Sequence, residues 1–271
     1  MDFKSNIYHF LIAAFVVSIL VATNHKKILS GNSKYIQRHT YTNAYRCLGY
    51  NVSDFDSMTT SLNDEESFLH NNYFKGVCGG RYVELGAHDG VNQDNTLAFN
   101  TILNWTGLLI EPSPARFKKL KKNRKRDTLV NQAICKTSRT VHFIDRSYVG
   151  GILEYMNQEF INYWHSKVDM TALPTIQCST FESIASKDGT FYDFLSLDVE
   201  GGEFPVLETL GSIQFGVILV ESDGRNPVKD YSVRSLLEKN EYIFDGKHSK
   251  SQWFVNKRWH NIYRDIMYEQ R

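Results

Sequence analysis

The chain has 271 residues, a formal net charge of +1 and 42% hydrophobic residues. This length suits one domain with additional segments, and it is enough to bury a sizeable core. A net charge near zero gives no overall field that would attract a polyanionic partner. Glycine and proline are not enriched and no internal repeat is visible, which excludes collagen-like, low-complexity and solenoid proteins.

The N-terminal part of the chain contains an apolar segment. Residues 7–23 carry no Asp, Glu, Lys or Arg. A membrane-spanning helix needs roughly 20 apolar residues and a signal-peptide core about 7–15, so this segment falls between the two. Because a small-residue cleavage site is poor here, we expect an uncleaved signal anchor at 7–23 after a short tail at 1–6. A cleaved signal peptide and a buried helix of the domain are the alternatives.

Two features disagree about the side of the membrane on which the rest of the chain lies. Lys26 and Lys27 outweigh Lys4, and the positive-inside bias would then keep the following residues in the cytosol. Against this, the sequence has two N-glycosylation sequons, at Asn51 and Asn104. We favour the sequons and expect a single-pass type II membrane protein of the Golgi or endoplasmic reticulum, with its main domain in the lumen.

The four cysteines, Cys47, Cys78, Cys135 and Cys178, are widely spaced. None belongs to a C-x-x-C pair, so a structural zinc site is not expected. Dispersed cysteines fit a reduced cytosol and equally one or two disulfides in the secretory pathway. They leave both the compartment and the pairing open.

The chain divides into a polar segment and a segment of regular alternation. Residues 24–70 have little periodicity and predict a stem or a loosely docked extension, whereas 71–271 predict the main domain. Continuous apolar runs are typical of strands buried on both faces, as in a parallel sheet with helices on each side. Two closing strands indicate an antiparallel hairpin, and we expect a seven-stranded, mostly parallel, Rossmann-like α/β sheet. In chain order the elements are strand 82–85, helix 95–104, strand 108–110, helix 114–126, strands 128–131 and 141–144, a short helix opened by a capping box at 179–182, strand 191–199, helix 204–210, strand 217–220, helix 232–240, and strands 242–244 and 252–255.

Two of the predicted strands end on acidic residues. Glu84 and Gly86 lie in the string RYVELGAHDG, with His88 and Gly90 after them, and Glu111 ends the next strand. In nucleoside-binding α/β domains, glycine lets the ligand approach the backbone, and an acid one strand later accepts hydrogen bonds from ribose hydroxyls. We therefore expect an adenosine-like cofactor, and the absence of both G-x-G-x-x-G and a P-loop argues against other nucleotide-dependent enzymes. An ordinary tight turn and a helix-capping carboxylate are the alternatives.

A third strand leads into Asp198 and Glu200, within the string DFLSLDVEGGEF. Alternation along the strand places both carboxylates on one side, at the sheet edge where ligands bind in open α/β folds. Carboxylates close together can raise the pKa of one of them toward that of a useful general base. Glu221 and Asp223 end the next strand, so a divalent metal is an alternative, but no His lies beside these acids and we expect no metal. Capping of the following helix is the other alternative.

The run from Arg116 to Arg126 carries eight Lys or Arg residues. As a helix it would bury Phe117 and Leu120 and leave the cations in water. We prefer this interpretation to a polyanion-binding patch or a localisation signal. Accordingly, we expect no nucleic-acid partner.

The strings VELGAHDG, NWTGLLIEPSP, VNQAIC and DFLSLDVEGGEFPVLETL together resemble the FkbM-type methyltransferases that use S-adenosylmethionine (SAM). The resemblance extends roughly over residues 81–255. It implies a class I methyltransferase fold, SAM as cofactor, and in-line O-methylation of a hydroxyl on a sugar, glycan or small molecule. Membrane-anchored Star-like relatives act in secretory trafficking, and a catalytically inactive trafficking protein is the alternative function.

The resemblance also implies roles for individual residues. Asp198 and Glu200 would face the acceptor, with Asp198 as the first candidate for the catalytic base. Glu111 would bind the ribose. The other cofactor-binding residues would be Glu84, Gly86, Asp89 and Asn95 at the methionine and ribose end, and Asn131 to Ala133 near the adenine.

Overall fold

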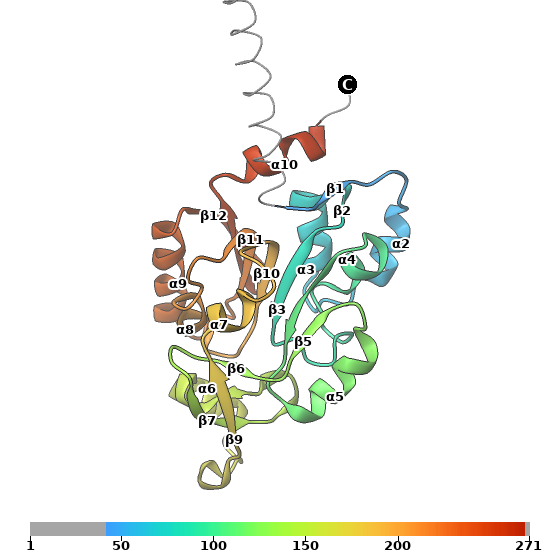
Figure 1. Cartoon of the computed structure of the whole chain (residues 1–271). Coiled ribbons are helices and arrows are strands. Elements are labelled where there is room, and N and C mark those ends of the chain that lie inside the picture. Colours follow the sequence, from blue (N-terminus) through green and yellow to red (C-terminus); the bar gives the residue numbers. More distant parts are fainter. Residues whose placement is uncertain (1–41, 269–271) are drawn as a thin grey trace, which may run out of the picture. The chain divides into compact units, whose positions relative to one another are not determined.

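The computed structural model describes residues 42–268. Its centre is a seven-stranded sheet made of β3 (Arg81–Leu85), β4 (Thr106–Ile110), β5 (Thr128–Val130), β10 (Phe191–Leu197), β11 (Gln214–Glu221), β12 (Tyr242–His248) and β13 (Ser251–Asn256). The strands lie in the order β12-β13-β11-β10-β3-β4-β5 (Figure 1). Five neighbouring strands are parallel, while β13 is antiparallel to β11 and to β12. The predicted mostly parallel sheet with a closing hairpin is confirmed.

The order of the strands places a topological switch point between β3 and β10. From β3 the chain moves outward through β4 to β5, and it then returns to the other side of β3 to add β10 and β11. In open α/β sheets, ligands bind outside the carboxyl ends of the strands at such a point. The turns after β3, β4 and β10 are therefore the parts of the chain that position a site.

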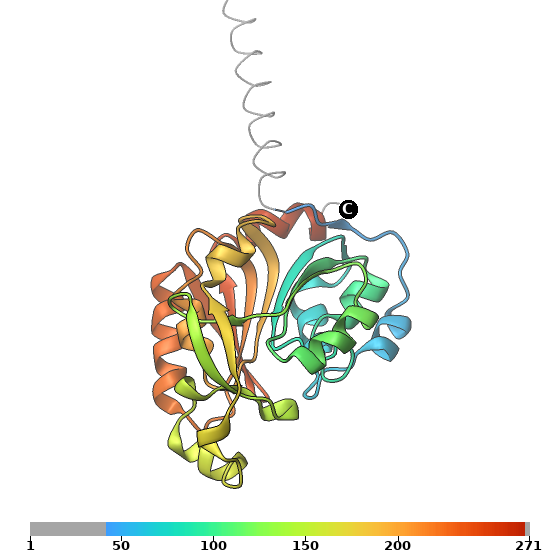
Figure 2. The same cartoon turned by 60° about the horizontal axis from the view of Figure 1, so that its bottom comes forward.

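Helices cover both faces of this sheet (Figures 1 and 2). Side chains alternate along each strand, so Tyr82 of β3 joins the core of one face while Val83 and Leu85 join the core of the other. The first core receives residues from α3 (Glu65–Leu69), α4 (Leu97–Ile102), α5 (Pro114–Asn123) and α10 (Trp259–Tyr268). The second receives residues from α7 (Phe181–Ala185), α8 (Glu203–Leu207) and α9 (Pro227–Lys239).

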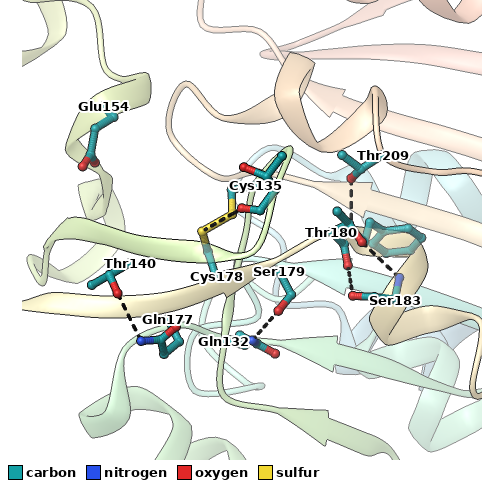
Figure 3. Close-up of a disulfide and its surroundings, with 12 residues drawn as sticks. Gln132, Cys135, Thr140, Glu154, Gln177, Cys178, Ser179, Thr180, Ser183 and Thr209 are labelled. Atoms are coloured by element: carbon teal, nitrogen blue, oxygen red, sulfur yellow. Dashed lines mark hydrogen bonds between the residues drawn. A yellow bond between two sulfur atoms is a disulfide. The ribbon is translucent and has the colours of Figure 1, made fainter.

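A second, four-stranded sheet follows β5 in the chain and lies below the main sheet in Figure 1. Of its strands, the sequence predicted only part of β7, because the others are short and lack an apolar run. A disulfide between Cys135 and Cys178 joins its first and last segments, and beside it Gln132 Nε2 donates to Ser179 Oγ at 2.7 Å (Figure 3). The elements of this region are β6 (Ala133–Ile134), β7 (Arg139–Ile144), η2 (Ser147–Val149), β8 (Gly151–Ile152), η3 (Leu153–Tyr155), α6 (Gln158–Trp164), η4 (Met170–Ala172) and β9 (Thr175–Ser179).

Residues 42–70 are packed into the domain, so the predicted stem and the predicted domain start at residue 71 are wrong for this part of the chain. Phe55 and Leu69 are fully buried. A second disulfide, between Cys47 and Cys78, fastens the segment to the strand before β3. The remaining elements are β1 (Tyr45–Arg46), α2 (Val52–Met58), the π-helix η1 (His70–Phe74) and β2 (Val77–Cys78).

A buried carboxylate explains why this segment looks like a polar stem in the sequence. Glu66 is fully buried. Its carboxylate accepts hydrogen bonds from the amide of Thr60 at 2.6 Å and from the amide of Ala98, at the start of α4, at 2.7 Å. Burying a charged residue is tolerated when it satisfies backbone donors in this way. An acidic residue here therefore supports the core instead of facing water.

The predicted signal anchor at 7–23, the tail at 1–6 and the part of the predicted stem before residue 42 lie outside the described residues. Between residues 42 and 268, no helix is both long enough and apolar enough to cross a membrane. The signal anchor stays a prediction.

The capping box predicted for the start of α7 is wrong by one residue. Thr180, rather than Ser179, is the N-cap, and its hydroxyl accepts from the Ser183 amide at 3.3 Å. The Glu182 carboxylate accepts instead from the amide of Ser212, at 3.1 Å. Glu182 thus joins α7 to the turn before β11.

The basic helix α5 buries Leu120 as predicted, but Arg124, just after the helix, is also buried, with 1% of its surface exposed. The expectation that all cations of this run lie in water is therefore wrong for Arg124. Its guanidinium pairs with Asp94 at 2.7 Å and with Asp127 at 3.0 Å, and it donates to the Tyr82 hydroxyl at 2.7 Å. This network ties the segment after β3 to α5 and to β5.

We predict that Arg124→Met lowers the free energy of unfolding by about 3–5 kcal/mol, because it leaves buried carboxylates without their cation. Urea denaturation followed by circular dichroism measures this loss. The matched control is Lys118→Met on the exposed face of α5, which should change stability by less than about 0.5 kcal/mol. Equal effects of the two substitutions would contradict the prediction.

Candidate functional site

An open cavity lies at the carboxyl ends of the central strands, at the switch point of the sheet. It contains about 830 Å³ of space, part of which is open to solvent. One wall comes from the turns after β3, β4 and β10, and another from β6, β7 and β8 of the second sheet. The second sheet therefore completes a site that the main sheet begins.

Gly86 brings the turn after β3 against the end of β10. Its φ is +84°, in the left-handed region that favours glycine. A Cβ at this position would lie 2.0 Å from the carbonyl oxygen of Asp198. The Asp198 amide in turn donates to the carbonyl oxygen of Leu85 at 3.3 Å. Gly86 and Asp198 both line the cavity, so the structure brings these two predicted residues together.

His88 lies between Gly86 and Gly90 in the turn after β3. Its φ is +48°, so the backbone keeps the left-handed conformation although a side chain is present. The imidazole stacks on the ring of Tyr148, with the ring centroids 4.6 Å apart, and both residues line the cavity. Burial lowers the pKa of His88, which favours the neutral ring.

Glu84 and Asn95 point into the protein and do not line the cavity. Glu84 is 3% exposed. Its carboxylate accepts from the amide of Asn95 at 2.9 Å and from the hydroxyl of Thr96 at 2.7 Å, and burial raises its pKa well above the ordinary value. The Asn95 side chain donates to Ser196 Oγ of β10 at 3.0 Å. Both predicted residues hold the segment behind the turn in place.

Asp89 and Asn131 likewise shape the walls of the cavity from behind. Asp89 Oδ1 accepts from the amide of Asn92 at 2.9 Å and so closes the turn after β3. Asn131 Nδ2 donates to the carbonyl oxygens of Glu111 and Pro112, at 2.8 and 3.0 Å. Their predicted direct contacts with a cofactor stay predictions.

Glu111 lines the cavity directly after β4, as the ribose role requires. Its Oε2 accepts from the His88 amide at 2.9 Å, and its Oε1 accepts from the Ser113 amide at 2.7 Å. Burial raises the pKa of Glu111 to about 7, although these two backbone donors oppose the shift. These hydrogen bonds fix the orientation of the Glu111 carboxylate before any ligand binds. The predicted residue Ala133, on β6, also lines the cavity.

Asp198 and Glu200 both line the cavity, on the loop that follows β10. The Asp198 side chain is exposed to the cavity. Desolvation by the surrounding protein and the charge of the nearby Glu203 carboxylate raise the pKa of Asp198 to about 7. Glu200 has a φ of +57°, and burial together with the charge of Asp198 raises its pKa well above the ordinary value. The predicted pair of carboxylates is thus present, with its proton affinity increased.

Two further residues that the sequence analysis did not identify complete this carboxylate cluster. Glu203, in the first turn of α8, is fully buried. Lys229 of α9 places its ammonium 2.9 Å from Glu203 Oε2 and 3.4 Å from Glu221 Oε2. Burial alone would lower the pKa of Lys229, but these carboxylates outweigh it and raise the pKa. Asp198, Glu203 and Glu221 each present an oxygen within 4.8 Å of the others, a spacing that a metal ion could also bridge.

Other cavity residues gave no usable signal in the sequence. Arg116 belongs to the basic run, where it was expected to face water, and the others lie in turns or in the second sheet. Lys229 follows Glu221 by eight residues, but the sequence does not show that its side chain turns back onto Glu221 and Glu203. These additional lining residues include Asn92, Gln93, Arg116, Phe143 and Tyr148.

The family model described as the methyltransferase FkbM domain matches residues 84–244. No curated protein sequence matches the chain. Among solved structures, the chain is similar to the methyltransferase FkbM from Methylobacillus flagellatus KT, at 11% identity and a TM-score of 0.40, over 76% of this chain and 58% of that chain. It therefore spans less than two thirds of that protein.

Two other solved structures are similar at the same remote level. One is the fibrillarin of Aeropyrum pernix in complex with SAM, at 12% identity and a TM-score of 0.36, over 66% of each chain. The other is the precorrin-6y C5,15-methyltransferase from Geobacter metallireducens GS-15, at 12% identity and a TM-score of 0.39, over 74% of this chain and 94% of that chain. The family match covers more than half of the 271 residues. The chain belongs to the FkbM family of SAM-dependent methyltransferases.

Proposed function

We propose that this methyltransferase acts on a hydroxyl group of a sugar, a glycan or a small molecule, and that Asp198 accepts the hydroxyl proton. The observation that carries the proposal is the contact between Gly86 and Asp198. A Cβ on Gly86 would collide with the Asp198 carbonyl oxygen. The turn after β3, which is expected to bind the cofactor, is therefore next to the residue proposed as the base. A base must lie next to the reacting group to be effective, and this contact supports such a position for Asp198.

The residues of the cavity fit SAM. Glu111 offers a fixed carboxylate for the ribose hydroxyls, and the side chains of Ile110, Ala133 and Ile134 offer an apolar surface for the adenine. Gly86 and His88 of the turn after β3 line the same cavity and would contact the methionine part. When bound, SAM supplies an electrophilic methyl group.

The charges around Asp198 support its role as the base. Glu203 and Glu221 pair with Lys229, whereas no ion pair is present at Asp198 among the described residues. With a pKa raised to about 7, Asp198 is ionised at slightly alkaline pH and is still basic enough to accept a proton from a hydroxyl. The proton moves from the acceptor oxygen to the Asp198 carboxylate while the chain holds the two groups in position.

A second, smaller cavity supports a polar acceptor. It holds about 310 Å³ of space and shares Glu200 with the first cavity. Its walls include Asn157, Glu221, Asp223 and Asn226. Carboxylates and amides are suited to hydrogen bonds with several hydroxyl groups. Calorimetry with SAM and its demethylated product, followed by transfer of labelled methyl to a panel of hydroxylated glycans, tests the proposal.

For the compartment, we propose the lumen of the Golgi or the endoplasmic reticulum, with residues 7–23 as the membrane anchor. Two disulfides in one domain are typical of an oxidising compartment. The two sequon asparagines, Asn51 and Asn104, are both exposed and therefore accessible to glycosylation.

We predict that Glu111→Ala weakens SAM binding more than tenfold, because charge-assisted hydrogen bonds contribute about 1.5–3 kcal/mol each. Since the carboxylate is the better acceptor, wild-type affinity should also fall as pH is lowered through about 7. Calorimetry measures both effects. Glu238→Gln, an exposed residue on α9, serves as the control and should bind normally. Unchanged affinity in a folded Glu111→Ala protein would remove the ribose assignment.

We predict that Asp198→Asn leaves SAM affinity nearly unchanged and lowers turnover by about 10²–10⁴, the usual contribution of a positioned base. In the wild type, turnover should rise with pH through about 7, because the base works only when deprotonated. Steady-state kinetics across pH provides the measurement, with Asp56→Asn on exposed α2 as the control. Lost SAM affinity with normal turnover at saturating cofactor would make Asp198 a cofactor residue instead.

We predict that the protein made in a eukaryotic cell carries glycans on Asn51 and Asn104. Endoglycosidase treatment should increase its gel mobility, and Asn51→Gln and Asn104→Gln should each remove one step of this shift. Asn72→Gln, an exposed residue outside any sequon, serves as the control. An unmodified protein whose domain is digested by protease in intact microsomes would rule out the lumenal location.

A further inference from the structure

The ammonium group of Lys229 lies inside the carboxylate cluster. Its Nζ lies 2.9 Å from Glu203 Oε2, 3.2 Å from the backbone oxygen of Glu221 and 3.4 Å from Glu221 Oε2. The side chain is 8% exposed. The Asn226 side chain accepts from the Lys229 amide at 3.0 Å and so fixes the start of α9. The ammonium is therefore held between two carboxylates from two different elements.

Glu203 also contacts the loop after β10, which contains the candidate base Asp198. Its Oε1 accepts from the amides of Val199 and Gly201, at 3.2 and 3.1 Å. These two amides flank Glu200, whose φ of +57° is unusual for a residue with a side chain. One carboxylate thus binds the lysine with one oxygen and the loop backbone with the other.

The same carboxylates have the spacing of a cation site. Oxygens of Asp198, Glu203 and Glu221 lie within 4.8 Å of one another. Three carboxylates at this distance repel one another unless a cation lies among them. In this structure the ammonium of Lys229 supplies that charge for two of them.

We propose that Lys229 is a positioning residue whose ammonium takes the place of a divalent cation among Asp198, Glu203 and Glu221. It thereby fixes the loop that carries Glu200 beside the acceptor. The expected effect of Lys229 on catalysis rests on the proposed function, whereas its role in fixing the loop does not. The charged groups that surround Asp198 in this arrangement are Glu65, Glu200, Glu203, Glu221, Asp223 and Lys229.

The ion pairs also determine which carboxylates have no cationic partner and are available to contact the acceptor. Lys229 pairs with Glu203 and Glu221, and Arg225 pairs with Asp223 at 3.0 Å. Asp198 and Glu200 have no such pairing among the described residues. They also face the main cavity. The lysine therefore separates carboxylates that hold the loop from carboxylates that meet the acceptor.

The first test uses Mn²⁺ as the probe, because carboxylate oxygens suit this ion. Calorimetric titration of the full chain with MnCl₂ should show at least tenfold tighter binding by Lys229→Ala than by the wild type. Lys239→Ala, an exposed lysine near the end of the same helix, should behave as the wild type. Addition of Glu221→Gln to Lys229→Ala should abolish the new site. If the wild type binds Mn²⁺ as tightly as Lys229→Ala, the proposal is wrong.

The second test follows the loop itself by hydrogen exchange at the amides of Val199 and Gly201. Exchange should become at least tenfold faster in Lys229→Ala, and saturating Mn²⁺ should restore protection. Lys229→Arg keeps the cation and should protect these amides as the wild type does. If Lys229→Ala does not fold, Lys229→Gln replaces it in both tests. Unchanged exchange in a folded neutral variant would overturn the proposal.

Turnover links the two tests to catalysis. With an acceptor from the glycan panel, Lys229→Ala should lose about 10–100-fold in kcat, the usual effect of removing a group that orients catalytic residues. KM for SAM should stay nearly constant, and Mn²⁺ or Lys229→Arg should recover kcat. Loss that neither restores would indicate a merely structural lysine. If the wild type methylates no acceptor, the proposed function fails, while Mn²⁺ binding and hydrogen exchange still decide the role of Lys229.

Discussion

The close contact between Gly86 and the carbonyl oxygen of Asp198 is the constraint on which the rest of the site depends. It joins the turn after β3 to the end of β10 at the switch point of the sheet. Buried carboxylates then hold both sides from within, since Glu84 binds the segment behind the turn and Glu203 binds the loop after β10. Glu84 and Glu203 are thus occupied by the backbone, whereas Asp198 and Glu200 face the cavity.

The main sheet could be predicted from the sequence because each of its central strands is an apolar run with a clear end. The second sheet could not, because strands as short as 133–134 and 151–152 have no period to detect. The packed segment at 42–70 was mistaken for a stem for a related reason. Some of its polar residues, such as Glu66, are buried, and a contact that stabilises this burial comes from Ala98, which is distant along the chain.

Some residues of the candidate site could likewise be predicted from the sequence, and others could not. Residues that directly follow a strand, such as Gly86, Glu111 and Asp198, were predicted and do line the cavity. Strand ends locate a residue at the sheet edge, but they do not reveal whether its side chain turns outward, which is why Glu84 proved to be buried. Lys229 could not be found at all, because its place depends on how α9 packs and no local pattern encodes that.

The disulfide between Cys47 and Cys78 has a mechanical consequence. It bridges 31 residues of sequence and lies where β1 pairs with β2, next to the start of β3. A pull on the chain upstream of Cys47 would pass through this covalent bond into the central sheet. The intervening helices α2 and α3 would carry none of the tension. The packed segment that contains Glu66 is thereby shielded from force, and chemical reduction of the disulfide would remove this protection.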